Sequence, residues 1–333
     1  MRFNIESDDG NLVRLWLAPD NPADVPVLSI WSGHRAVAEI SANTMRPDVR
    51  DHGLHLTGEA GFTLDESVVP GIAQMADLEL REPNSGVPIY ARVRADQHSA
   101  RRVLVWTRPS AIAPAGSTRA DFALIYPDLD RLSLETAGAV LDSWKSPSML
   151  AIGRPNLLRF SELLDRQSFE VNFVLTDPYV DVAERLLAML ARDDDAQPAH
   201  ALMLGALQDT SLDNHRELVR FFRTLERTES AMLRSPVVRA LTKSPEEDVR
   251  RQDVSVALKV LARNRVVCTE QTLHLFTAES QLVATPPEIL SLSERLRQIE
   301  PVSDLLNEDL ALYHYVGLAV AVAHKAMLDK GAV

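Results

Sequence analysis

The sequence is poor in several features that mark particular classes of protein. It contains one cysteine among 333 residues, Cys268, so no internal disulfide can form and we expect a reducing compartment. The first ten residues, MRFNIESDDG, contain no apolar stretch of the kind found in a signal peptide. The longest late apolar run, VGLAVAVA at 316–323, is far shorter than the ~20 residues that cross a bilayer. We therefore expect a cytoplasmic protein without a transmembrane segment.

Positive charge is scarce as well. The chain has 35 Lys and Arg against 47 Asp and Glu, which gives a formal net charge of −12. Nucleic acids and anionic membranes both favour clustered positive charge, so we expect neither as the main partner. For the same reason, a highly phosphorylated ligand would need a local basic pocket.

Familiar catalytic and cofactor motifs are missing. The sequence has no GxGxxG, no Walker motif, no paired-carboxylate signature and no serine in a nucleophile elbow. His52 and His55 are spaced like a chelating pair, but no cysteine and no third ligand accompany them. We expect no metal site, and we expect Cys268 to be a small buried hydrophobe.

What is present divides the chain into two regions, and its length suggests two domains. Between residues 11 and 106, short alternating runs are separated by turns such as Ser32-Gly33 and Asn84-Ser85-Gly86, which is typical of a small β-sandwich. The stretch TRPSAIAPAGSTRA at 107–120 is rich in Ala, Pro and Ser, as linkers are. We predict a β-sandwich domain over residues 1–108 and a linker over 109–121.

From residue 122 onward, apolar residues recur three and four positions apart, which predicts helices. Three short apolar runs interrupt them: MLAIG at 149–153, VNFVL at 171–175 and VVCTE at 266–270. Strands separated by helices favour a parallel sheet, with ligands at the carboxyl ends of its strands. We predict a two-domain α+β protein whose second domain, 122–333, is helix-rich α/β with a short parallel sheet. The predicted helices span 132–144, 157–164, 180–190, 214–225, 246–261, 271–282, 287–298 and 308–328.

Several features of the first region occur in a fixed order: Trp16, APDNPADVPV, Gly33, Ala42, RPDV at 46–49, Gly53 and Gly61-Phe62. This order resembles a β-sandwich module attached to bacterial glycosyltransferases and related surface-polysaccharide proteins, over residues 10–89. The alternative is structural: Gly33 and Gly61 are turn residues, and Arg46 and Asp48 form an ion pair. The resemblance implies a bacterial protein of surface-glycan synthesis or modification.

Three segments of the second region also follow a family order: VLTDPYVDVAERLL at 174–187, VALKVLARNRVVCTEQTLHLFTAESQL at 256–282 and LNEDLALYHYV at 306–316. They resemble the strand and RDP helix, the later helix–strand–helix unit and the terminal N-x-x-D-x-x-L-Y helix of sulfotransferase-type P-loop domains. Members of that family modify glycans from a phosphoadenosine phosphosulfate donor. The resemblance therefore implies a sulfotransferase-like fold.

The family binds the 3′-phosphate of its donor with an Arg and a Ser. On this chain those positions correspond to Thr176 and Glu184. A carboxylate repels phosphate at a place where the family needs donors and positive charge. The resemblance thus implies that this contact has diverged.

The family's donor loop follows its first strand and holds a Lys or Arg with Gly and Ser or Thr, whose backbone amides hold a phosphate. With MLAIG as the first strand, the corresponding segment is GRPNLLRFSELL at 153–164. Arg154 and Arg159 supply charge there, whereas Leu157 and Leu158 occupy the place of small residues. Pro155 removes one amide donor.

The resemblance assigns ligand contacts to Arg154, Asn156, Arg159 and Thr176, and the role of base to Asp177 or Glu270. Structural alternatives stand beside these roles. Arg154 is equally able to pair with Asp177 or Glu270, and an Asp before Pro is a common helix cap.

Three hypotheses follow. In the first, the second domain is diverged and non-catalytic and binds a saccharide or a glycan-synthesis enzyme. In the second, it is an active sulfotransferase or other glycan-directed transferase, with phosphoadenosine phosphosulfate as donor. In the third, the protein is a structural subunit, and a homo-oligomer is compatible with any of the three. Losing a charge-assisted contact costs about 1.5–3 kcal/mol, so the diverged phosphate contacts favour the first hypothesis.

Overall fold

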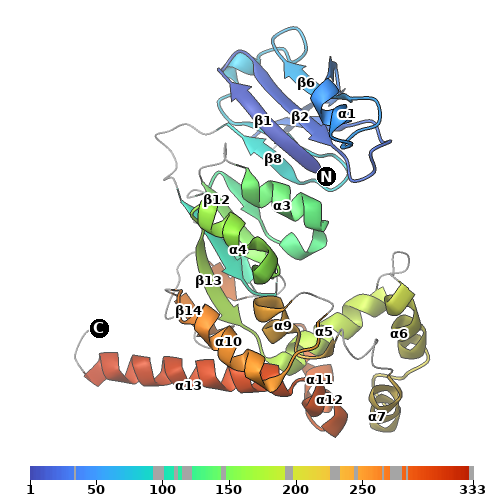
Figure 1. The fold of residues 1–333 in the computed structure, drawn as a ribbon, viewed down its shortest axis with the longest axis vertical. Coiled ribbons are helices and arrows are strands. Elements are labelled where there is room, and N and C mark those ends of the chain that lie inside the picture. Colours follow the sequence, from blue (N-terminus) through green and yellow to red (C-terminus); the bar gives the residue numbers. More distant parts are fainter. Residues whose placement is uncertain are drawn as a thin grey trace. The chain divides into compact units, whose positions relative to one another are not determined.

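The structure is a computed structural model of the whole chain (Figure 1). It describes residues 1–33, 35–92, 101–108, 112–114, 122–143, 148–191, 198–225, 233–243, 247–264, 266–270, 280–282 and 284–329. These residues form two compact units. Unit 1 comprises Met1–Leu104, Pro114–Gly153 and Phe160–Glu170, and unit 2 comprises Val105–Ala113, Arg154–Arg159 and Val171–Val333.

Two antiparallel sheets form the amino-terminal part of unit 1, in the orders β1-β2-β6-β5 and β4-β3-β7-β8. Along β2, Val13, Leu15 and Leu17 are buried while Arg14 is exposed, because successive residues of a strand face opposite sides of the sheet. The strands predicted from residue 11 onward are confirmed as β2 to β4 and β6 to β8, whereas β1 and the short β5 were not predicted. The strands are β1 (Arg2–Asp8), β2 (Val13–Ala18), β3 (Val27–Ser32), β4 (Arg35–Ser41), β5 (Thr44–Met45), β6 (Glu59–Leu64), β7 (Leu78–Arg81) and β8 (Pro88–Ala91).

Residues that support the first resemblance have local structural roles. A Cβ on Gly61 would lie 2.8 Å from the carbonyl oxygen of Thr44, so only glycine lets β5 and β6 approach this closely. Arg46 donates to Asp48 at 2.7 Å and forms a second ion pair with Glu6 at 2.6 Å. These contacts agree with the ion pair stated for Arg46 and Asp48. Gly61 also has a structural role, but it lies inside β6 and not in a turn, so that expectation was wrong.

A five-stranded parallel sheet follows, in the order β11-β12-β9-β13-β14. The three predicted strands are confirmed as β12, β13 and β14. Two further strands were not predicted there: β9 was assigned to the sandwich, and β11 was not expected at all. The strands are β9 (Arg102–Trp106), β11 (Leu124–Tyr126), β12 (Met149–Gly153), β13 (Glu170–Leu175) and β14 (Val266–Thr269).

The position of β9 corrects two expectations. All five of its residues are buried, which suits the centre of a parallel sheet covered on both faces rather than a half-exposed sandwich strand. In addition, β9 and β11 both precede β12 along the chain. MLAIG is therefore the third strand of this sheet and not the first, so the segment at 153–164 does not follow the first strand.

Helices account for most of the remaining described residues. The predicted helices at 132–144, 157–164, 180–190, 214–225, 246–261, 287–298 and 308–328 are confirmed with shifted ends. The observed helices are α1 (Pro47–Asp51), α3 (Leu134–Asp142), α4 (Leu157–Arg166), α5 (Pro178–Ala191), α6 (Pro198–Gln208), α7 (His215–Thr224), α9 (Pro236–Thr242), α10 (Arg251–Leu261), α11 (Pro287–Leu296), α12 (Glu300–Leu305) and α13 (Asn307–Asp329).

The helix predicted over 271–282 lies mostly outside the described residues, but its last part is wrong. Residues 280–282 form a strand, β15 (Ser280–Leu282), that pairs with β10 (Ile112–Pro114). β10 falls within the predicted linker at 109–121, whose other residues lie outside the described part. The predicted domain boundaries at 108 and 122 stay a prediction.

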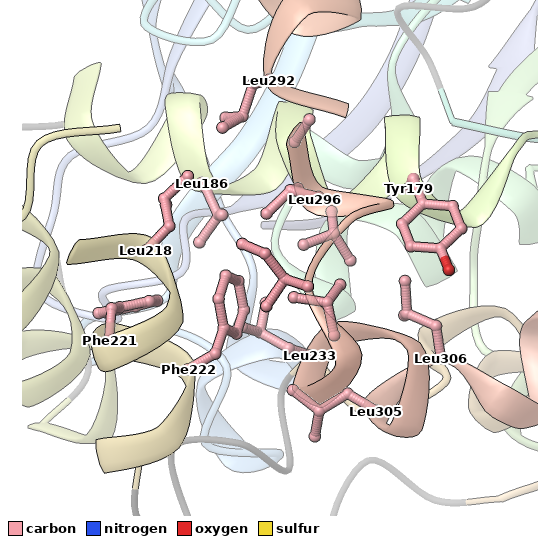
Figure 2. Close-up of a cluster of buried hydrophobic side chains, with 14 of the residues drawn as sticks. Tyr179, Leu186, Leu218, Phe221, Phe222, Leu233, Leu292, Leu296, Leu305 and Leu306 are labelled. Atoms are coloured by element: carbon pink, nitrogen blue, oxygen red, sulfur yellow. The ribbon is translucent and has the colours of Figure 1, made fainter. Parts of the chain in front are cut away.

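A hydrophobic cluster in unit 2 holds α5 in place (Figure 2). Leu186 of α5, Phe222 of α7 and Leu296 of α11 are buried in it, together with Leu305 of α12. Because α5 begins directly after β13, this cluster also positions the side chains at the start of α5. No helix in the described ranges has the length and apolarity to span a membrane.

Candidate functional site

The candidate site lies where the strands of the parallel sheet end. β9 and β13 are neighbours, and the next strands of this sheet along the chain, β11 and β14, lie on opposite sides of that pair. In open α/β sheets, ligands bind in the crevice at such a reversal, outside the carboxyl ends of the strands. The residues of this edge described below all belong to unit 2.

Arg108 is the most buried arginine at this edge, with only 3% of its side chain exposed. It lies two residues after β9 and forms ion pairs with Glu184 of α5 and with Glu270 after β14. Its Nη2 also donates to Thr285 at 3.4 Å. The sequence reasoning missed Arg108 because it placed this arginine at the start of a linker. The signal that could have revealed it is its position directly after a wholly apolar run.

Glu270 lies at the end of β14, as the sequence predicted. Its burial raises the pKa of its carboxyl group to about 7, and the nearby charge of Arg108 offsets part of that rise. The carboxyl group is therefore close to half-protonated at neutral pH. That state suits a group that exchanges a proton, although its hydrogen bond to Arg108 at 3.3 Å engages one of its oxygens.

Arg154 pairs with Asp181, and both side chains are buried. The arginine donates to both carboxylate oxygens, and Arg185 donates to one of them at 3.2 Å. Burial by itself would raise the pKa of Asp181, but the two arginines outweigh it and hold the pKa well below its usual range. The expected partners of Arg154, Asp177 or Glu270, were therefore wrong. Asp181 takes that place because it lies one turn into α5 on its buried face.

Asp177 has the geometry of a helix cap. One carboxylate oxygen accepts from the backbone amide of Tyr179 at 3.0 Å, at the first turn of α5, and Pro178 begins the helix. The other oxygen accepts from Arg297, whose guanidinium lies 4.8 Å from the centre of the Tyr179 ring. Both oxygens are thus engaged, which favours the capping alternative over the role of base.

Asn156 and Arg159 lie at the start of α4. Asn156 accepts from the backbone amide of Arg159 at 3.2 Å and donates to the carbonyl of Lys243 at 2.6 Å, so it also has a capping geometry. The Arg159 side chain is exposed. Of the two leucines expected to fill this segment, Leu157 is buried and Leu158 is exposed.

Two threonines and one aromatic residue complete the edge. Thr176 is buried after β13, and Thr107 is buried after β9 with no hydrogen-bond partner for its hydroxyl. The Trp106 indole donates to the carbonyl of Pro155 at 3.0 Å, and the Arg154 guanidinium lies 5.9 Å from the ring centre. Burying an unpartnered hydroxyl is costly, so Thr107 is the strained polar group of this edge.

Four of the arginines at the edge are paired with carboxylates. They are at positions 108, 154, 185 and 297, and the carboxylates are at positions 177, 181, 184 and 270. The side chain of Arg159, at the start of α4, is instead exposed. The buried arginines of this edge, Arg108 and Arg154, therefore already lie against carboxylates.

Metal-ligating side chains do not cluster in the described ranges. No three His, Cys, Asp or Glu side chains come together there in a way that could hold a metal ion. His52 and His55 are hydrogen-bonded instead to the carbonyls of Asp48 and Asp24. Cys268 is buried in β14, and burial raises the pKa of its thiol to about 12.

Comparison with known proteins found no matching protein-family model, no matching curated protein and no matching solved structure.

Proposed function

We propose that this protein acts in surface-glycan synthesis or modification in a bacterial cytoplasm. In this proposal the parallel-sheet region is a diverged, non-catalytic sulfotransferase-like domain. Its carboxyl edge binds a saccharide, or a glycan-synthesis enzyme, and does not hold a nucleotide donor.

The observation that supports this proposal is that arginines at the edge are paired with carboxylates. A phosphate group brings at least one full negative charge, so it binds tightly where arginine donors are uncompensated. At this edge Arg108, Arg154 and Arg297 already lie against carboxylates. A phosphate would have to displace one of those carboxylates and leave it near a second anion.

Saccharide hydroxyls make a different demand. A hydroxyl both donates and accepts, so it hydrogen-bonds to a carboxylate and to a guanidinium without adding net charge. Glu184 and Glu270 accept hydrogen bonds, and Arg108 donates them, within one cluster. A neutral, hydroxyl-rich ligand therefore fits this edge better than an anionic one.

The test is a comparison of ligand classes by thermal shift and titration calorimetry. We expect no stabilisation by phosphoadenosine phosphate and clear stabilisation by a member of an oligosaccharide panel. At a hundredfold excess over its dissociation constant, a ligand stabilises by about 2.7 kcal/mol. The double variant Glu184→Gln, Glu270→Gln should gain affinity for phosphoadenosine phosphate, because it removes two negative charges that lie against Arg108. Glu288→Gln, on the exposed face of α11, is the matched control and should change nothing.

A second candidate function is that of an active transferase. It is favoured by the position of β9 as the first strand of the parallel sheet along the chain. The family's donor loop follows the first strand and contains an Arg or Lys with Gly and Ser or Thr. Here the first strand of the parallel sheet is β9, and Arg108 follows it. The sequence continues to Gly116, Ser117 and Thr118, which lie outside the described residues.

The same assay separates the two candidates. An active transferase requires stabilisation of the wild-type chain by phosphoadenosine phosphate, lost in Arg108→Gln and kept in Arg159→Gln. Each variant is compared with its own ligand-free melting temperature, since Arg108 is buried. A chain that binds neither nucleotide nor saccharide would exclude the transferase and the saccharide-binding form of the proposal, and would agree with the binding of a partner enzyme or with the structural-subunit hypothesis.

A further inference from the structure

Helix α13 has two apolar faces. One face packs inside unit 2, where Leu312, Val316 and Val320 are buried. On the outward face the exposed fractions are 59% for Tyr315, 66% for Leu318 and 69% for Val322. These values are high for side chains of this size on a protein surface, so the outward face leaves much apolar area in contact with water.

The outward face also lacks charge. Between Asp309 and Lys325 the helix contains no Asp, Glu, Lys or Arg. Neighbouring helices of unit 2 differ, because the exposed positions of α10 include Arg251 and Lys259, and those of α11 include Glu288 and Glu294. A helix that is apolar on all sides is normally buried on all sides. The outward face of α13 therefore has the composition of an interface.

The spacing of the outward residues indicates what covers them. Ala311, Tyr315, Leu318 and Val322 are separated by four, three and four positions, which is the spacing of the seam between two paired helices. In Figure 1 the carboxyl-terminal part of α13 extends past α10 and β14, and residues 321–323 are all exposed. The outward face is thus accessible to a second helix over about four turns.

We propose that α13 pairs with α13 of a second copy of this chain about a two-fold axis. Each copy has a net charge of −12, so two copies repel wherever their charged surfaces meet. The uncharged face over residues 310–324 is where that repulsion is smallest. An identical face on the partner supplies the same apolar seam, as the self-complementary interface of a two-fold dimer requires.

Charge also argues against the other possible covers. A helix that lies on a membrane surface normally has Lys and Arg along its polar side, and residues 310–324 have none. A partner that recognises charge would find nothing complementary on this stretch. Composition, spacing and charge together therefore support a second copy as the partner.

The test is the oligomeric state of the full chain by sedimentation equilibrium between about 1 and 100 µM. We expect a dimer for the wild-type chain. The double variant Leu318→Glu, Val322→Glu places four carboxylates in the seam of each dimer and should weaken the dimer at least ~10²-fold. Both positions are exposed, so the variant should keep its melting temperature. Leu290→Glu, at an exposed leucine of α11, is the matched control and should stay dimeric.

Cross-linking gives a second, independent measurement. Leu318→Cys lies near the middle of the seam and should form a disulfide-linked dimer under mild oxidation, whereas Leu290→Cys should not; the native Cys268 is buried. A wild-type chain that is monomeric at every concentration would overturn the proposal, as would a dimer that survives the double variant. A monomer that binds phosphatidylcholine vesicles through this face would assign it to lipid and would equally overturn it.

Discussion

Arg92, in the antiparallel region of unit 1, and Arg108, at the parallel-sheet edge of unit 2, are both largely buried but are held by different kinds of group. Arg92 donates to the Asp8 carboxylate at 2.8 and 3.0 Å, and it also donates to the backbone carbonyls of Gly10, Ile72 and Met75. Arg108 instead contacts two carboxylates from separate elements, one of which has a pKa of about 7.

The difference shows that a buried arginine has a fixed structural role in one region and lies in a titrating network in the other. Backbone carbonyls do not titrate, so Arg92 permanently links the turn after β1 and the segment 72–75 to Asp8 of β1. The hydroxyl of Tyr90 donates to Asp8 as well, and these bonds together outweigh burial and lower the pKa of that carboxyl. Carboxylates exchange protons and move with their side chains. Arg108 therefore lies in a network whose charge depends on conditions near neutral pH.

The largest expected effect concerns the pair beside Arg108. Asp181→Ala should destabilise unit 2 by about 3–5 kcal/mol, because it leaves Arg154 buried without its bidentate partner. Urea unfolding measures this loss. The double variant Asp181→Ala, Arg154→Leu should recover much of it, since it removes the uncompensated charge. A loss below about 1 kcal/mol in the single variant would contradict the buried pair.

The pH dependence of stability is the next largest effect. The pKa of Glu270 is raised by burial from 4.5 to about 7, so the folded state keeps a proton that the unfolded state loses. The proton on Glu270 contributes at most about 3 kcal/mol to the free energy of unfolding. The whole contribution is present below pH 4.5, and it is lost as the pH rises to 7. Asp309, which burial also raises to a pKa of about 7, acts in the same direction.

Chemical denaturation at several pH values between 4.5 and 8 measures that slope. Glu270→Gln should make the slope of stability against pH less steep, because the variant lacks the contribution of this residue. The contribution of Asp309 should remain. An unchanged slope in Glu270→Gln would mean that the folded protein does not hold this proton. Asp8 in the antiparallel region acts in the opposite direction and at lower pH, because its pKa is lowered from 3.8 and its stabilisation is lost only as the pH falls below that value.

A smaller effect is expected in the antiparallel region. Asp8→Asn should cost about 2 kcal/mol, because it weakens the charged hydrogen bonds of Arg92 but leaves its three carbonyl acceptors in place. Thermal unfolding measures the change. Ligand binding at the parallel-sheet edge should be unaffected, which would separate the two roles. Asp48→Asn is the control, an exposed carboxylate whose loss should not alter the melting temperature measurably.

The smallest effect concerns the cap of α5. Asp177→Ala should cost about 1 kcal/mol through the lost bond to the Tyr179 amide, and Asp177→Ser should restore most of it. If Asp177 were instead a catalytic base, the serine variant would be as stable as the wild type yet lose any transferase activity. Stability and activity measured on the same two variants distinguish these roles.

The local sequence pattern was enough to predict most helices and strands, but it was not enough to predict the sheet to which each strand belongs. RVLVW at 102–106 is as apolar as MLAIG at 149–153, and each run is compatible with a strand in either kind of sheet. The run was assigned to the sandwich because it follows other strands in sequence. The helix expected to end at Leu282 failed at 280–282 for a similar reason, because those residues instead pair with β10 far away in the chain.

For the candidate site, the sequence located the edge and some of its members. Arg154, Thr176, Asp177 and Glu270 do lie at the carboxyl ends of β12, β13 and β14, since the position of a strand end follows from the apolar run before it. The pairing among them was beyond the sequence, because several arginines and several carboxylates were available in this stretch of chain. Only packing selected Asp181 for Arg154.

By itself the sequence determined most of the antiparallel strands, most of the helices, and the strands β12, β13 and β14, because alternation and three-to-four spacing depend on residues only a few positions apart. Only the tertiary structure decided that β9 is central and that Arg108 lies against Glu184 and Glu270, 76 and 162 positions away. The physical reason is that burial and ion pairing depend on which surfaces meet in space, and no local spacing records that.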